Sequence, residues 1–153
     1  MSEDVAAELR ADLDELAELV LDLPAAQLEL RPAEPGAWTA RQVLAHLADF
    51  ELIAAVRVRT VLSMDRPALA SYGQEDFTDR FSALETAEDA LERFTVNRLA
   101  TLRVLEALGP ADLERTGVHP GRGEETLRRT LEMVVRHDRA HLEQLARAAE
   151  GRG

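Results

Sequence analysis

The chain has 153 residues, a length that predicts one domain spanning residues 1–153. It contains no cysteine, which excludes disulfides, thiolate metal ligands and a cysteine nucleophile. Its net charge of −11 argues against nucleic-acid binding, because phosphate contacts need clustered basic side chains. All 18 basic residues are arginine, which excludes chemistry that depends on a lysine amine.

Nothing in the sequence indicates a membrane or secreted protein. No apolar run approaches the roughly 18 residues that a membrane span requires. The first four residues, Met1-Ser2-Glu3-Asp4, are acidic and lack the basic start of a signal peptide. We therefore expect a cytoplasmic protein without a membrane partner.

Apolar residues at helical spacing predict two helices in the first half of the chain. The first covers residues 3–22, and a connection rich in proline follows over residues 23–37. The second covers residues 39–63 and starts with a capping box, in which Thr39 is followed three residues later by Gln42.

The second half predicts two more helices and no strand. A connection over residues 64–78 leads to a helix at residues 82–108, which ends at Gly109-Pro110. After a glycine-rich connection, the last helix covers residues 124–149. The predicted fold is therefore all-α, an antiparallel four-helix bundle with long connections that form a rim over one end.

Three of the four histidines lie on predicted core faces. His137 and His141 are four residues apart, so they share one face of the last helix, and His46 lies on the apolar face of the second helix. Burying three imidazoles together is costly without a shared partner, and a divalent cation would supply one. A three-His site with open coordination positions suits catalysis better than a closed structural site. The alternative is three core histidines with ordinary hydrogen-bond partners.

Several other residues leave alternatives open. Asp138 follows His137, which excludes the His-Glu-x-x-His protease motif. Asp49 and Asp138 could orient the imidazoles, although solvated charges on helix faces are the simpler interpretation. Trp38 is expected to pack as a hydrophobic staple rather than to line a pocket, and His119 is expected in an exposed loop. Three arginines could attract an anionic substrate or make surface ion pairs: Arg57, Arg59 and Arg66.

Two segments resemble a known family. Residues 38–51, WTARQVLAHLADFE, resemble the Trp-Ser/Thr…His-Leu-x-Asp/x-x-Glu signature of the DinB-like (YfiT-like) superfamily, and residues 137–141, HDRAH, resemble its second signature. The resemblance implies a four-helix bundle, frequent homodimers and one divalent metal ion, often zinc or nickel. Its implied metal ligands are His46, His137 and His141. Family members of known activity include thiol-dependent S-transferases and a mycothiol-dependent maleylpyruvate isomerase.

These observations favour a metal-dependent enzyme, with no catalytic residue assigned beyond the metal ligands. In one version, a low-molecular-weight thiol binds the metal as thiolate and attacks a small electrophile under the long connections, as in an S-transferase. In another, a metal-dependent hydrolase uses activated water. The lack of a general base on the core faces favours the thiol version. A different class is also open, a non-catalytic, stress-associated binding or scaffold protein.

Overall fold

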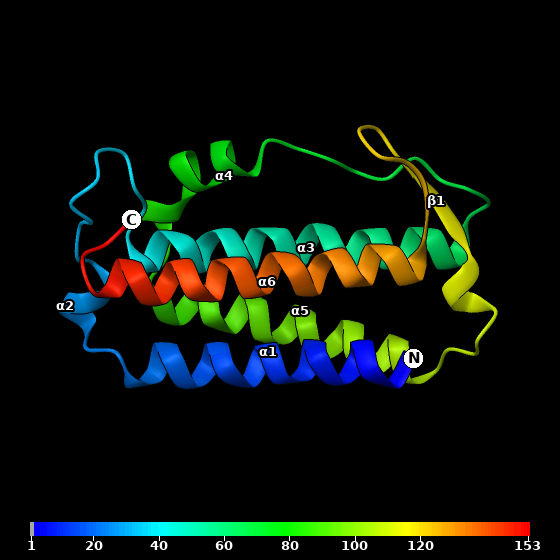
Figure 1. Cartoon of the computed structure of the whole chain (residues 1–153), viewed down its shortest axis with the longest axis horizontal. Coiled ribbons are helices and arrows are strands. Elements are labelled where there is room, and N and C mark those ends of the chain that lie inside the picture. Colours follow the sequence, from blue (N-terminus) through cyan, green and yellow to red (C-terminus); the bar gives the residue numbers. More distant parts are fainter. Residues whose placement is uncertain (1) are drawn as a thin grey trace.

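Four long helices form the body of the molecule (Figure 1). The computed structural model describes residues 2–153, and side chains from residue 5 onward. The long helices are α1 (Ser2–Asp22), α3 (Ala40–Ser63), α5 (Ala87–Glu106) and α6 (Leu127–Ala149). The predicted four-helix bundle with long connections is therefore confirmed. Among the described residues, no helix combines the length and the apolarity that crossing a membrane would need.

The helices do not alternate in direction along the chain. At one end of the core, the C-terminal halves of α1 and α6 pack against the N-terminal halves of α3 and α5, and the opposite halves meet at the other end. The pairs α1–α5 and α3–α6 are therefore antiparallel, whereas α3 and α5 run parallel, as do α1 and α6. Helices α3 and α5 can run parallel because the connection between them, residues 64–86, runs back along the bundle beside α3. It does not form a rim over one end (Figure 1).

Side-chain caps determine where the long helices begin. Thr39 and Gln42 form the predicted capping box at α3, each side chain accepting the other residue's backbone N–H. Thr86 and Asp89 form the same box at α5. The predicted start of that helix at residue 82 is therefore wrong. The residues before Thr86 form two separate short helices, α4 (Gln74–Phe81) and the 3₁₀ turn η1 (Ser82–Leu84). Two more short helices lie in other connections, α2 (Ala25–Leu28) and the 3₁₀ turn η2 (Asp112–Glu114).

A small hairpin precedes α6, so the expectation of no strands was wrong, as was the predicted helix start at residue 124. Strands β1 (Thr116–His119) and β2 (Gly123–Thr126) pair antiparallel, and Thr126 then caps α6. Strands of four residues are too short to show a recognisable alternation. The hairpin holds the α3–α5 connection, because Leu69 N–H donates to Val118 C=O at 2.8 Å and Val118 N–H donates to Pro67 C=O at 2.8 Å.

Gly117 is the point where the hairpin packs most closely on the bundle. A Cβ at this position would lie 2.5 Å from Leu69 Cδ2 and 3.1 Å from Val61 Cγ2. We expect Gly117→Ala to destabilise the protein by about 1–3 kcal/mol, because the buried neighbours must move apart. Chemical denaturation tests this, with Gly109→Ala as the control, since a Cβ there meets only Asp112 Oδ2 at 3.9 Å. Equal effects of the two substitutions would contradict close packing at Gly117.

A buried ion-pair network joins all four long helices. Arg98 of α5 is fully buried and donates to the Leu9 carbonyl of α1 at 2.9 Å. Its guanidinium also donates to both carboxylate oxygens of Glu51 in α3, at 3.0 and 2.7 Å, and to Asp138 in α6 at 2.7 Å. Because Asp138 lies between His137 and His141 in the sequence, the network fixes the segment of α6 that carries both histidines.

Candidate metal centre

The three predicted site histidines come together where α3 packs against α6. His46 Nε2 lies 3.1 Å from His137 Nε2 and 3.1 Å from His141 Nε2. All three nitrogens lie within 4.8 Å of one another. Ligands about 2.0–2.1 Å from a tetrahedral zinc ion are roughly 3.3 Å apart, which is close to the observed spacing. The His46–His137–His141 cluster therefore has the dimensions of a metal site.

Burial keeps these imidazoles neutral. Burial, with a smaller contribution from His141, lowers the pKa of His46 to about 4. Burial, with smaller contributions from His141 and His46, lowers the pKa of His137 to about 2. Burial also lowers the pKa of His141, against the opposing effects of Gln144 and the Glu75 charge. The neutral form is the one that binds a metal ion.

The hydrogen bonds also favour a shared cation. His141 Nδ1 lies 2.7 Å from Gln144 Oε1, an acceptor, so the proton is on Nδ1 and the lone pair is on Nε2. The Nδ1 atoms of His46 and His137 are buried and have no partner among the described residues. A single Nε2–H on His46 cannot donate good hydrogen bonds to both His137 Nε2 and His141 Nε2. One cation, in contrast, accepts the Nε2 lone pairs of all three histidines. The residues present therefore fit a divalent metal ion.

Aromatic rings hold two of the imidazoles. The Phe50 ring stacks on His137, with centroids 3.6 Å apart and planes 17° apart. The Trp38 ring lies 5.1 Å from the His46 ring. Trp38 therefore contacts a site histidine, and the simpler interpretation of it as only a hydrophobic staple was incomplete. These ring contacts position imidazoles whose Nδ1 atoms have no hydrogen-bond partner among the described residues.

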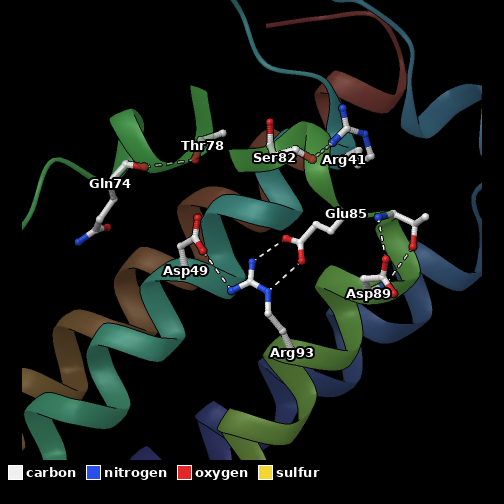
Figure 2. A network of polar contacts seen from close by, with 9 residues as sticks. Arg41, Asp49, Gln74, Thr78, Ser82, Glu85, Asp89 and Arg93 are labelled. Carbon is white, nitrogen blue, oxygen red and sulfur yellow. Dashed lines mark hydrogen bonds and ion pairs between the residues drawn. The ribbon is translucent and has the colours of Figure 1, made fainter. Parts of the chain in front are cut away.

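Asp49 and Asp138 do not bond to the histidines, so neither orients an imidazole directly. Asp138 is buried and pairs with Arg98. Burial, together with the neighbouring Glu51 charge, raises its pKa to about 7, although Arg98 opposes this shift. Asp49 is half-buried and pairs with Arg93 at 3.0 Å, and the same arginine binds both oxygens of Glu85 (Figure 2). The interpretation as freely solvated charges was therefore also wrong for both aspartates.

A pocket of about 310 Å³ opens beside His141. Both long connections contribute to its walls, which consist of Gly36, Ala37, Trp38, Glu75, His141 and Gln144. Glu75 of α4 brings a carboxylate to the mouth of the site, close enough for its charge to raise the pKa of His141. The sequence missed this residue because α4 lay within a predicted loop. A larger hollow of about 550 Å³ beside α2 contains none of the histidines.

The three arginines and the fourth histidine considered from the sequence have different surroundings in the structure. Arg66 pairs with Glu124 at the surface, and Arg59 donates to the Ala55 carbonyl of its own helix. Arg57, in contrast, is buried, so surface ion pairing was the wrong interpretation for it. His119 ends β1 and is half-buried rather than exposed, and its Nδ1 accepts two backbone N–H bonds in the hairpin turn.

The lowered pKa values predict how zinc affinity depends on pH. Three imidazoles of ordinary pKa 6.5 would lose roughly 70-fold in metal affinity between pH 8 and pH 6, because protons compete for the ligands. His46 and His137 stay neutral far below pH 6, so only protonation of His141 could weaken binding over this range. The pKa of His141 is also lowered, and we therefore expect a loss of less than about fourfold. The affinity should fall steeply only as the pH approaches the pKa of about 4 at His46. Competition with a chromophoric chelator measures this, and a loss near 70-fold would contradict the neutral cluster.

A four-helix bundle that brings three neutral imidazoles to one point has the architecture of bundles that carry a metal site on facing helices. The chain belongs to the DinB superfamily, whose family model matches residues 8–145. This confirms the resemblance seen in the two histidine-containing segments.

Relatives and a solved structure agree with this placement. A Bacillus mycoides protein with the name "Putative metal-dependent hydrolase BcerKBAB4_2443" is 29% identical over 84% of this chain and 73% of its own length. An Oceanobacillus iheyensis protein of similar name is 28% identical over 80% of this chain and 71% of its own. YfiT from Bacillus subtilis, which has an unusual four-helix bundle topology, superposes with a TM-score of 0.87 at 22% identity, over 97% of this chain and 86% of YfiT. This likeness shows that the two chains share a fold.

Proposed function

We propose that this chain is a metal-dependent hydrolase in which His46, His137 and His141 hold one zinc or nickel ion. The convergence of three Nε2 atoms from α3 and α6 carries this proposal. Three imidazole nitrogens suit zinc and nickel, whereas magnesium and calcium prefer oxygen ligands. The names of the relatives, which refer to metal-dependent hydrolysis, support the same reaction class.

The bound metal would supply a Lewis acid that makes water nucleophilic at neutral pH. Glu75 is placed to take the proton, because it lines the same pocket as His141. Trp38 forms an apolar wall of that pocket and would hold the substrate against the site. The proposal thus assigns metal binding to three histidines and proton transfer to Glu75.

A thiol S-transferase is the second candidate. An external thiol would take the place of water, and the same cation would stabilise its thiolate. The apolar contribution of Trp38 to the pocket supports this candidate, since a thiol with an apolar electrophile needs such a wall. Glu75 supports hydrolysis instead, because a thiolate is already deprotonated and needs no general base during attack.

Turnover assays separate the two candidates. We would load the protein with zinc or with nickel and supply 4-nitrophenyl esters of short acids, and separately 1-chloro-2,4-dinitrobenzene with cysteine or glutathione. For a hydrolase we expect ester cleavage without thiol, and Glu75→Gln should lower kcat by about 10²–10⁴-fold. For a transferase, the thioether should form clearly faster than in the spontaneous reaction without protein, and Glu75→Gln should have little effect on that rate.

His137→Ala is the control for metal dependence. Glu143→Gln is the matched control for Glu75→Gln, because it removes an exposed carboxylate on α6. Activity that persists in His137→Ala would contradict a reaction at this centre. A protein that binds metal but turns over neither substrate set would favour the non-catalytic binding protein.

A further inference from the structure

Arg57 is a buried arginine that forms no ion pair among the described side chains, although the Glu125 charge acts on it. The residue is 5% exposed, and its Nε donates to the Ala70 carbonyl at 2.7 Å. It forms no ion pair with any described residue, although the chain contains 29 acidic residues. Arg98, which is also buried, binds two carboxylates. A buried charge is costly unless it is paired, so Arg57 lacks the partner that such a position normally has.

The terminal nitrogens of Arg57 remain open to solvent, although the residue as a whole is 5% exposed. Both terminal nitrogens, Nη1 and Nη2, lack a hydrogen-bond partner among the described residues, and neither belongs to the polar atoms sealed from solvent. These two nitrogens form the planar fork that binds a carboxylate with two parallel hydrogen bonds. The Nε bond to Ala70 meanwhile fixes the orientation of the guanidinium.

Helix α3 places this fork on the same side as the metal centre. Arg57 follows His46 by eleven residues, about three helical turns, so both lie on one face, roughly 16 Å apart along the axis. An arginine side chain reaches back toward the N-terminus of its helix, which shortens this distance. Phe50 lies between them, with its ring centroid 6.0 Å from Arg57 Cζ and stacked on His137. The Arg57 charge also contributes to the lowered pKa of His137.

The charges of Arg57 and of the hairpin residues next to it add up to +1. Burial lowers the pKa of His119, and Arg122 and Arg57 lower it further, so this histidine is neutral there. Its Nδ1 accepts backbone N–H bonds, which leaves a proton on Nε2 that can be donated. Arg122 is paired with both oxygens of the buried Glu125, so these two charges cancel. A single positive charge matches a monoanionic carboxylate better than a phosphate dianion.

We propose that Arg57 binds a carboxylate group of the substrate, so that the site accepts small carboxylate-bearing molecules whose reacting group lies at the three histidines. This substrate class rests on the proposed function. The carboxylate site itself does not, because it is built from Arg57 and can be tested in protein without metal.

Side-chain NMR of the full chain tests the proposal. The Nε–Hε signal of Arg57 would be followed at constant ionic strength during titration with propionate, then with its neutral amide, propionamide, and with inorganic phosphate. We expect a saturable shift with propionate, none with propionamide and weaker binding of phosphate. Arg57→Gln should weaken propionate binding at least tenfold, whereas Arg59→Gln, the exposed neighbour on α3, should leave it unchanged.

Repeating the titration with zinc present separates this site from the metal centre. Propionate should still shift the Arg57 signal when zinc is bound. A shift confined to the histidine signals, equal effects of propionate and propionamide, or tighter binding of phosphate would each overturn the proposal. A protein that fails to bind zinc would contradict the proposed function, while the metal-free titration would still decide the carboxylate site. The direct signal in the wild-type protein decides the matter even if Arg57→Gln does not fold.

Discussion

Arg98→Met should destabilise the protein by about 3–5 kcal/mol, because it leaves Glu51 and Asp138 buried without their shared cation. For a chain of this length, such a loss corresponds to a fall of roughly 6–20 °C in Tm. The substitution also removes the hydrogen bond to the Leu9 carbonyl, and with it a contact between α5 and α1. Thermal and urea unfolding at neutral pH would measure the change.

Arg103→Met is the matched control, since Arg103 is exposed on the same helix and should change stability by no more than about 0.5 kcal/mol. A double-mutant cycle adds a second check. Glu51→Leu alone should also be strongly destabilising, but Arg98→Met with Glu51→Leu should cost clearly less than the sum of the two. Additive losses would contradict a coupled buried network.

Zinc should stabilise the metal-free protein substantially. When free zinc exceeds its Kd by about 1,000-fold, binding to the folded chain adds about 4 kcal/mol to the free energy of unfolding. The stabilisation arises because the three nitrogens are close together only in the folded bundle. Unfolding of chelator-treated protein over a range of free zinc concentrations would measure it.

Two histidine variants make this result specific. His137→Ala should abolish most of the stabilisation by removing one of three ligands. His119→Ala should retain it, because His119 lies in the hairpin and bonds to backbone N–H groups there. An equal response of the two variants would mean that zinc binds elsewhere.

The bundle and the histidine cluster were predictable because both depend on local spacing. Apolar periodicity identified α1 and α3 almost to the residue, and the Thr39–Gln42 capping box marked the start of α3. His137 and His141 share a face in any helix that contains both. The facing position of His46 then followed from its place on an apolar stripe and from the family resemblance.

The rest of the site depends on contacts between distant segments, which spacing does not reveal. Glu75 reaches the pocket only because residues 64–86 run back along the bundle and place α4 near His141. Arg98 meets Glu51 and Asp138 because α5 and α3 are parallel, a consequence of the same connection. Arg57 looked like one of three surface arginines. It is buried because the α3–α5 connection lies next to it, with the Ala70 carbonyl accepting its Nε–H and the adjacent residues bonding to the hairpin.

The metal content of the protein is the most direct test of the central claim. Untagged protein, purified without chelator, would be analysed for metals beside His137→Ala prepared in the same way. We predict close to one zinc or nickel ion per wild-type chain and a near-complete loss in the variant. Wild-type protein that contains no metal and takes up neither added zinc nor nickel would contradict the claim, as would equal metal content in the two proteins.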